Sequence, residues 1–317
     1  MLEQLVVKAA LNIALDAGHK FAEIFAEHKI VFSAGLDNGK LERIRSGLDA
    51  GCGFRIINGK RTYYGFVNSL RSAEILDLAR RVSRLAQSAG KKRTANFSCR
   101  SYQATPQKMT EREKMDLLAA AEKTARGHSK KICQATVRLA ESWQKILAAN
   151  TDGVWSEDER LRRRFFVQCV ARGKNGDLQT GYESAGFTAS WGDFNAEQAA
   201  QLATLAAARA ELLLSAARAP AGTMPVVLSG EAGGTMIHEA CGHALEADFI
   251  YKKTSIFTDK LGARMFPQCV TIIDDGTMPG LYGSGFCDDE GTLCRKNILI
   301  NAGQVTGFMS DRLYAGL

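Results

Sequence analysis

Residues 21–70, FAEIFAEHKIVFSAGLDNGKLERIRSGLDAGCGFRIINGKRTYYGFVNSL, decide the fold of the first part of the chain. Two turn signals, Asp37-Asn38-Gly39 and Asn58-Gly59, interrupt runs of residues that favour strands. Asn-Gly between such runs indicates a hairpin, because both residues tolerate positive φ. We therefore predict successive short strands in an antiparallel meander. Before them, apolar residues such as Leu5 and Ile13 recur at the spacing of an amphipathic first helix.

Three more helices are predicted before residue 220. Two of them open with a capping box, Thr110 with Glu113 and Asn195 with Gln198, in which each side chain satisfies a backbone N–H group of the first turn. The third is indicated by apolar residues at helical spacing. The helices are expected over residues 72–89, from 110 to about 125, and from 195 to about 217.

Strand-like segments alternate with these helices in groups. This grouping favours an α+β fold over a doubly wound parallel sheet. Two long segments are each broken by a glycine turn, and MPVVLSG at residues 224–230 is predicted to be a buried strand that leads through a glycine-rich stretch into a helix. The other segments are expected over residues 136–159, 161–187, 269–280 and 297–309.

The chain length of 317 residues favours two domains, since one compact core seldom grows so large. Pro220, Gly222 and Pro225 mark the boundary. We expect an N-terminal α+β domain over residues 1–220 and a second domain over residues 221–317.

The composition indicates a cytoplasmic protein. The chain has 45% hydrophobic residues, and no run approaches the roughly 18 apolar residues of a membrane helix. The N-terminus lacks the basic and apolar regions of a signal peptide, and the eight cysteines form no CxxC pair, which predicts reduced thiols. We expect no membrane association.

The formal charge of +7 is spread along the chain and does not favour nucleic acid as a partner. The basic residues gather at Lys91-Lys92-Arg93, at Lys130-Lys131 and at Arg160 to Arg164. We expect these clusters to be solvated surface. A nucleic-acid groove stays the alternative, which failure to bind DNA at low salt would exclude.

The chemistry of the chain is concentrated in HEACGH, residues 238–243. His238 and His243 are potential metal ligands, and Glu239 is placed to act as a base toward a metal-activated water. In the related pattern HExxH the histidines are four residues apart, about 40° round a helix, so that both reach one metal ion. Taken alone, the motif leaves a metal site and two structural histidines as open alternatives.

The spacing of five makes a further structural prediction. Five residues on a regular α-helix place two side chains roughly 140° apart, too far to share one ion. We therefore predict that the helix ends or bulges before His243, with Gly242 supplying backbone angles that other residues avoid. Glu246 and Asp248, which follow the motif, also fit a metal site.

The segment GTMPVVLSGEAGGTMIHEACGHALEADFI resembles the core of the TldD proteins, the catalytic half of the TldD/PmbA family of zinc peptidases. Segments such as DAGCGFRI, TIIDDGTMPGLYGSGFCDDEGT and DRLYAGL are also similar to that family, over nearly the whole chain. The intact HExxxH pattern separates the chain from the PmbA side of the family, whose members lack it.

The resemblance implies a zinc-dependent peptidase that hydrolyses unfolded or short peptides, which bind as an added strand beside a sheet edge. His238 and His243 correspond to the zinc-binding histidines and Glu239 to the general base. The resemblance also implies a heterodimer with a PmbA-type paralogue. It further implies an N-terminal α+β domain that is followed by a β-rich domain, which carries the zinc.

The resemblance further implies a third zinc ligand, a cysteine downstream of the motif, beyond residue 317. We therefore expect an incomplete β-rich domain that lacks its C-terminal part. The alternative function is a truncated, non-catalytic fragment or an interaction subunit, with exposed core surface.

The cysteines and acidic residues near the motif have open roles. Cys241 is expected to be packed on another side of the motif helix. Small apolar core residues are the favoured interpretation of the three later cysteines, over zinc ligands. The acidic cluster Asp288-Asp289-Glu290 is consistent with a ligand or a pocket lining, but a solvated turn is favoured. The later cysteines are Cys269, Cys287 and Cys294.

Overall fold

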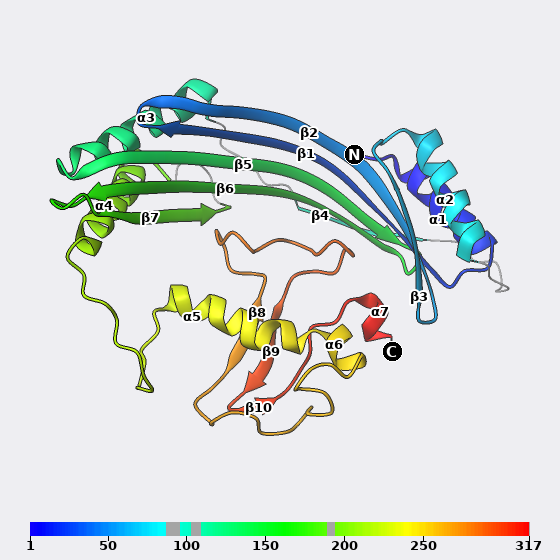
Figure 1. The fold of residues 1–317 in the computed structure, drawn as a ribbon. Helices are drawn as coiled ribbons and strands as arrows, with labels where there is room; N and C mark the ends of the chain where they lie inside the picture. Colours follow the sequence, from blue (N-terminus) through cyan, green and yellow to red (C-terminus); the bar gives the residue numbers. More distant parts are fainter. Residues whose placement is uncertain (87–95, 103–108, 189–193, 317) are drawn as a thin grey trace.

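The computed structural model describes residues 1–86, 96–102, 109–188 and 194–316 (Figure 1). The helices are α1 (Gln4–Asp16), α2 (Ser72–Ala86), α3 (Glu111–Gly127), α4 (Ala196–Leu213), α5 (Gly230–Ile237), α6 (Ala247–Tyr251) and α7 (Arg312–Ala315). The strands are β1 (Phe21–Asp37), β2 (Lys40–Asn58), β3 (Arg61–Val67), β4 (Ser98–Ser101), β5 (Ile132–Asn150), β6 (Val154–Arg172), β7 (Leu178–Phe187), β8 (Ile272–Asp275), β9 (Lys296–Asn301) and β10 (Gln304–Val305). The helices and mainly antiparallel strands confirm the α+β class.

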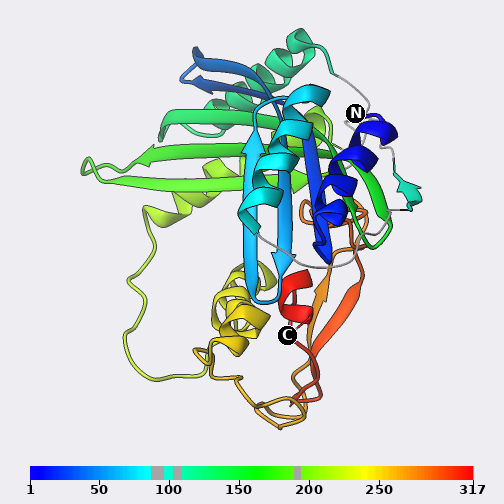
Figure 2. The same cartoon turned by 90° about the vertical axis from the view of Figure 1, so that its right-hand side faces the viewer.

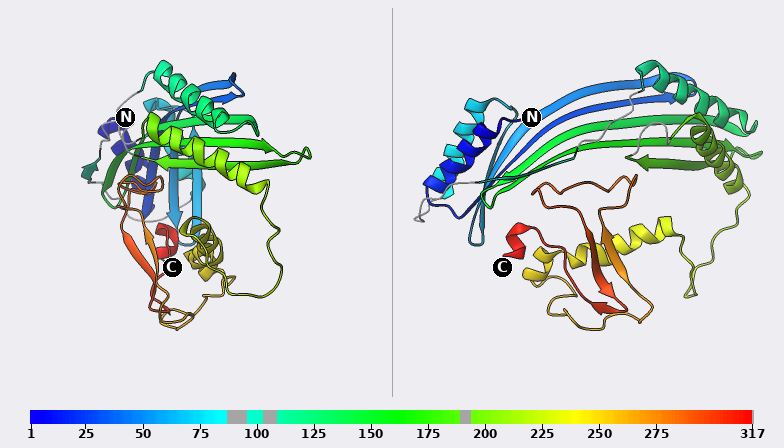
Figure 3. Two further views of the ribbon diagram at one scale, coloured as in Figure 1. Left: turned by 90° about the vertical axis from the view of Figure 1, so that its left-hand side faces the viewer. Right: turned by 180° about the vertical axis from the view of Figure 1, so that it is seen from behind.

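One long, arched sheet organises the N-terminal part, with strand order β3-β2-β1-β5-β6-β4 and with β7 paired to β6 (Figures 1 and 3). The predicted hairpins are confirmed, since Asn38, Gly39 and Gly59 adopt positive φ at the turns. The strands are much longer than expected, and β2 and β5 reach 19 residues each. Glycine turns at Gly153 and Gly176 separate β5, β6 and β7, as predicted.

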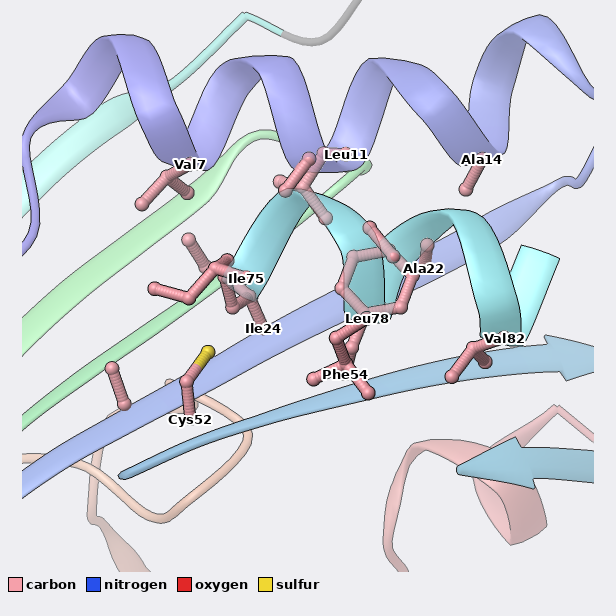
Figure 4. Close-up of a cluster of buried hydrophobic side chains, with 14 of the residues drawn as sticks. Val7, Leu11, Ala14, Ala22, Ile24, Cys52, Phe54, Ile75, Leu78 and Val82 are labelled. Carbon is pink, nitrogen blue, oxygen red and sulfur yellow. The ribbon is translucent and has the colours of Figure 1, made fainter. Parts of the chain in front are cut away.

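Two helix pairs cover the same face of this sheet, one pair at each end. The buried side chains of β1 that pack under α1 and α2, Ala22 and Ile24, have even numbers, as do Ala34 and Leu36 under α3 and α4. Successive side chains of a strand point to opposite faces, so both cores lie on one face. Figure 4 shows how α1, α2 and the strands pack together in the first core.

The helix boundaries follow the predicted caps at their N-termini more closely than at their C-termini. Both capping boxes are present, at Thr110 and at Asn195. The helix α4 ends at Leu213 rather than near residue 217. The residues that follow Leu213 are irregular and mostly exposed. The helix α2 is described to Ala86, and the predicted continuation over residues 87–89 lies outside the described residues.

The opposite face of the sheet contacts residues 276–295, which we call the docking loop. Alternate residues of β6 make the contacts, because only every second side chain faces the loop. The Oγ of Ser156 donates to the carbonyl of Gly291 at 2.8 Å, and an Arg160 guanidinium nitrogen donates to the carbonyl of Cys287 at 2.8 Å. The backbone N–H of Phe286 donates to the carboxylate of Asp158 at 3.3 Å. The docking loop thereby joins the C-terminal part to the sheet.

The expectation that the Arg160 to Arg164 cluster is solvated surface is wrong for two of its members. The side chain of Arg163 is only 1% exposed and pairs with Glu141 at 2.8 Å. Arg160 pairs with Asp158 and Asp289. The strand sends these arginines to opposite faces, and both faces are covered at this point. Of the other clusters, Lys131 pairs with Glu211 at the surface, and Lys91 to Arg93 lie outside the described residues.

The C-terminal part forms a small sheet of order β10-β9-β8 with its own core, which includes Leu245, Phe257 and Ile300. Its strands confirm two of the predicted segments. The predicted buried strand at residues 224–230 is wrong: residues 224–229 are irregular and exposed, and Val227 is 100% exposed. Among the described residues no strand pairs with this segment, and β-forming side chains alone do not make a strand. The division at residue 220 stays a prediction.

The C-terminal part lies below the long sheet, on the concave side of the arch (Figures 1 and 2). None of the described helices is both long and apolar enough to cross a membrane. All eight cysteines are free thiols.

Candidate metal centre

The HEACGH motif lies where the helix that begins with α5 changes its pitch. Ser229 caps α5 by accepting a hydrogen bond from the backbone N–H of Ala232. After α5, residues His238–Gly242 form a π-helical turn and His243–Leu245 form a 3₁₀ turn. The N–H of His243 donates to the carbonyl of His238, five residues earlier. The predicted distortion before His243 is confirmed, because one wide turn absorbs the extra residue of the motif.

Gly242 does not supply unusual backbone angles, so that part of the prediction is wrong. Its φ of −55° and ψ of −61° are helical values that any residue adopts. A Cβ at this position would lie 3.5 Å from Nδ1 of His238, an ordinary van der Waals distance. The wide hydrogen-bonding pattern of the turn, and not the freedom of glycine, brings the histidines together.

The π-turn brings His238, Glu239 and His243 into one exposed cluster. The two imidazole rings meet edge to face, with centroids 4.5 Å apart and planes at 67°. One ligand atom from each of the three residues lies within 4.8 Å of the others. Two imidazole nitrogens are donors that suit zinc, and the adjoining carboxylate can act on a water that zinc binds, so the residues present fit a zinc ion. Among the described residues this is the only such group of three or more.

Glu246 orients one of the histidines. Its carboxylate oxygen lies 2.7 Å from Nδ1 of His243, and this hydrogen bond raises the pKa of the imidazole. The other ring nitrogen, Nε2, lies 3.8 Å from a carboxylate oxygen of Glu239 and faces the cluster. A carboxylate on the outer nitrogen of a histidine is the usual arrangement around a protein-bound metal ion. Asp248 instead pairs with Lys252, at 2.7 Å.

The specific partner of His243 was not predicted from the sequence. The signal that identifies Glu246 is its position three residues after His243, which places the two side chains on one side of a tight turn. Asp248, which was considered alongside Glu246, is two residues further on and faces elsewhere.

The cysteines differ in their burial. Cys241 is 5% exposed and packs in the C-terminal core, as expected, and burial raises the pKa of its thiol. Cys287 is buried as well, and burial raises its pKa to about 12. Cys294 is half-buried. The expectation of a core position is wrong for Cys269, which is exposed in the segment that leads to β8. None of these thiols belongs to the cluster of three ligand atoms around the histidines.

The acidic residues of the docking loop line a cleft and hold the loop to the sheet. A cleft of about 1390 Å³ extends from Glu246 to Asp288, Asp289 and Glu290. Asp289 pairs with Arg160 at 2.7 Å, and Glu290 pairs with Arg55. The favoured interpretation as a solvated turn fits Asp289, whose side chain is 68% exposed, and is wrong for Glu290, which is 16% exposed. All three acidic residues also line the cleft. Asp288 itself is exposed, but the neighbouring chain partly desolvates its carboxyl group and thereby raises its pKa.

Comparison with known proteins agrees with the geometry of the motif. Three successive family domains match the chain: PmbA/TldA metallopeptidase domain 1 at residues 22–86, the central domain at residues 104–214 and the C-terminal domain at residues 221–317. The metalloprotease TldD homolog of Haemophilus influenzae is 30% identical over 99% of this chain and 68% of its own length. The chain belongs to the TldD/PmbA family of metallopeptidases.

This chain matches another TldD/PmbA relative over a similar share of that relative's length. The metalloprotease TldD homolog of Buchnera aphidicola subsp. Acyrthosiphon pisum is 32% identical over 94% of this chain and 64% of its own length. The chain therefore spans about two thirds of the length of the curated relatives that it matches.

Solved structures share the TldD/PmbA fold. A protein from Thermotoga maritima described as a putative modulator of a DNA gyrase superposes with a TM-score of 0.78 at 20% identity, over 93% of this chain and 68% of its own. TldE from Thermococcus kodakarensis superposes with a TM-score of 0.76 at 16% identity, over 98% of this chain and 71% of its own. At these identities the likeness concerns the fold alone.

Proposed function

We propose that this chain carries the metal-binding histidines and the general base of a TldD-type, zinc-dependent peptidase. The observation that supports it best is the convergence of His238, Glu239 and His243 at the π-turn. The metalloprotease names of the relatives support the same reaction class.

In this proposal His238 and His243 hold the zinc ion, and Glu246 keeps the ring of His243 in place. When bound, zinc supplies Lewis-acid chemistry, because it lowers the pKa of water toward neutrality and polarises a carbonyl group. Catalytic zinc normally takes three protein ligands. The cysteine that the family resemblance implies remains the proposed third ligand.

Glu239 acts as the general base. Its carboxylate is exposed and adjoins the histidine pair, with an oxygen 3.8 Å from Nε2 of His243. It accepts a proton from the attacking water and passes that proton to the amine that leaves when the peptide bond breaks. The substrate is an unfolded or short peptide, and the cleft beside Glu246 has the volume to receive a peptide segment.

A PmbA-type paralogue is the proposed partner, in a heterodimer that encloses the metal centre. The fold likeness to a TldE protein is consistent with such pairing. The centre is exposed in the single chain: the side chains of Glu239 and His243 are 66% and 49% exposed. Exclusion of folded substrates therefore requires a cover that a partner subunit supplies.

A second candidate function, an interaction subunit without activity, is favoured by the uncovered apolar surface of the C-terminal part. Val227, Ile256 and Leu261 are between 63% and 100% exposed. Apolar side chains that are exposed to this degree are consistent with a surface that another polypeptide covers.

Substitution of Glu239 separates the two functions. In the presence of the paralogue, Glu239→Gln should retain zinc and lose hydrolysis of an unfolded peptide, because only the base is removed. Asp248→Asn is the matched control, because Asp248 lies close to the motif but pairs with Lys252, and it should retain hydrolysis. A Glu239→Gln protein that hydrolyses peptide at the wild-type rate excludes Glu239 as the base. Wild type that binds zinc and the paralogue without any hydrolysis favours the interaction subunit.

A further inference from the structure

Five arginines lie close together on the concave face of the long sheet, opposite the face that the two helix pairs cover. Val137, Phe165 and Val167 are buried under α3 and α4, so the side chains that alternate with them on β5 and β6 point to the concave side. The strand register places two residues of β2 on the same side. We call these residues the arginine face: Arg43, Arg45, Arg138, Arg162 and Arg164.

The register brings these arginines together across the sheet. Arg45 on β2 and Arg164 on β6 occupy one row, because Ser33 and Ala140 lie in register between them. The distance between them is three strand spacings, or about 14 Å. Ser33 and Ala140 have short side chains, which leave the surface between the two arginines open. The adjoining rows contain the other three arginines.

Little negative charge balances the arginine face. Glu42 is the only acidic residue in the described part of the chain that forms an ion pair with one of the five, at 3.2 Å from Arg138. Exposed positive charge of this kind attracts an anionic ligand. The arginines that are exposed and that have no ion pair with another described residue are Arg43, Arg45 and Arg164.

The arginine face lies on the same side of the sheet as the metal centre. Arg162 donates a hydrogen bond from Nε to the backbone carbonyl of Tyr282, in the docking loop, at 3.2 Å. A Cβ on Gly186, which lies opposite Arg164, would be 3.2 Å from the ring of Tyr282. The docking loop therefore borders the arginine face. Figures 1 and 3 show α5, which leads into the HEACGH motif, on this concave side as well.

An extended peptide matches the spacing of the arginines. Alternate side chains of a strand are about 6.8 Å apart on one face. Arg162 and Arg164 have this spacing along β6, as do Arg43 and Arg45 along β2. A peptide that lies along these strands in an extended conformation presents its alternate side chains at the same spacing. Carboxylates two residues apart can then each meet one guanidinium group, which binds a carboxylate through two hydrogen bonds.

An acidic polypeptide is favoured over nucleic acid as the ligand. Single-stranded nucleic acid binds where its bases stack on aromatic side chains. The aromatic rings beside the arginines, Phe166 and Tyr182, stack on each other instead, with centroids 6.1 Å apart. The chain also belongs to a family of metallopeptidases, whose ligands are polypeptides.

The cleft beside the metal centre has the opposite charge. Seven acidic residues line it, from Glu246 to Asp311, against two arginines. Acidic side chains of a peptide are repelled by the cleft and attracted by the arginine face. The two regions on the concave side therefore select side chains of opposite charge.

We propose that the arginine face binds acidic side chains at alternate positions of an extended peptide substrate. The inference rests on the proposed peptidase function, because that function makes a polypeptide the ligand. The arginines determine the affinity for the peptide and not the chemical step, so binding can be measured without hydrolysis.

Peptide binding tests the charge selectivity. Fluorescence anisotropy measures binding to the whole chain with Glu239→Gln, so that the peptide stays intact. The probes are a labelled peptide in which glutamate alternates with serine and a counterpart in which lysine replaces glutamate. At low salt the glutamate peptide should bind about tenfold more tightly, since each exposed ion pair contributes at most about fivefold. Physiological salt should reduce this preference by screening.

Paired substitutions test the arginines themselves. Arg45→Gln together with Arg164→Gln should weaken binding of the glutamate peptide on the order of tenfold, because two ion pairs are lost. Arg80→Gln together with Arg84→Gln is the matched control. It removes the same charge from exposed positions of α2, on the opposite face of the sheet, and should leave the affinity unchanged. Arg45→Glu together with Arg164→Glu should shift the preference to the lysine peptide, an effect that a loss of stability does not produce.

Three results would overturn the proposal: equal affinity for the two peptides, equal affinity in the Arg45/Arg164 and Arg80/Arg84 glutamine variants, or a single-stranded oligonucleotide that binds more tightly than the glutamate peptide and loses affinity in the Arg45/Arg164 variant. Failure of the peptidase function gives a different result. In that case the glutamate peptide still binds through the arginines, but wild type with zinc and the paralogue does not hydrolyse it.

Discussion

The carboxylate of Glu246 accepts a hydrogen bond from Nδ1 of His243 at 2.7 Å, within a turn of only three residues. This contact fixes the imidazole so that Nε2 faces His238 and Glu239. The metal centre thus includes a support that the HExxxH pattern itself does not contain.

Removal of this support should weaken zinc binding without unfolding the chain. Glu246→Ala is expected to lower the zinc affinity about 10- to 100-fold, the usual effect of losing a partner of a metal-binding histidine. Competition titration against a zinc chelator measures the change. Asp248→Ala is the control because Asp248 pairs with Lys252 instead. Equal losses in the two variants would remove Glu246 from this role.

Gly242→Ala should be tolerated. The residue has helical backbone angles, and an added Cβ makes only ordinary contact with the ring of His238. Alanine is also a better helix former than glycine, by about 1 kcal/mol. We expect unchanged zinc content and a melting temperature at or slightly above that of wild type. Loss of zinc in Gly242→Ala would instead show that the turn requires glycine.

Arg160→Ala should release the docking loop. Arg160 is largely buried and pairs with both Asp158 and Asp289, so its removal leaves a buried carboxylate without its ion pair, at a cost of about 3 kcal/mol. Limited proteolysis under native conditions should cut residues 276–295 faster than in wild type. Arg164→Ala, further along β6 and exposed, is the control. Identical cleavage of wild type and Arg160→Ala would contradict the docking role.

Glu141→Gln should destabilise the N-terminal sheet. Glu141 accepts hydrogen bonds from Lys114 and from Arg163, whose side chain is 1% exposed. Removing one member of such a buried group costs about 3 to 5 kcal/mol in the free energy of unfolding. Asp77→Asn, in an exposed pair with Arg81, should cost less than about 1 kcal/mol. Urea unfolding at neutral pH compares the two.

The same residue predicts a pH dependence. Burial opposes ionisation of Glu141, but the hydrogen bonds from Lys114 and Arg163 prevail and lower its pKa below the ordinary 4.5. A lowered folded-state pKa stabilises the fold above pH 4.5 and loses that contribution as the pH falls through the lowered value. The acid loss of stability should be smaller in Glu141→Gln. If the free energy of unfolding falls equally with decreasing pH in wild type and in Glu141→Gln, this contribution is excluded.

The features that could be predicted from the sequence are those that a few neighbouring residues determine. Asn38-Gly39, the capping residues Thr110 and Asn195, and the five-residue spacing of the histidines each specify a local geometry, and the structure has all of them. The long strands and the two helix pairs on one face were not predicted, because pairing over such lengths is a property of the whole sheet.

The predictions from the sequence were wrong where tertiary contacts, and not the residue types, determine the local structure. The apolar run at residues 224–229 has strand-forming side chains but no neighbouring strand among the described residues, so it is irregular. Arg163 is charged but buried, because Glu141 lies directly opposite on β5. The pairing of Glu290 with Arg55, 235 residues apart, has no local signal at all.

Zinc analysis of the purified chain tests the central claim most directly. We expect about one zinc ion per chain in wild type, loss of zinc in His238→Ala and in His243→Ala, and full zinc content in the control His128→Ala, whose imidazole lies near Glu211. Wild type without zinc, or zinc that persists in both His238→Ala and His243→Ala, would contradict the account.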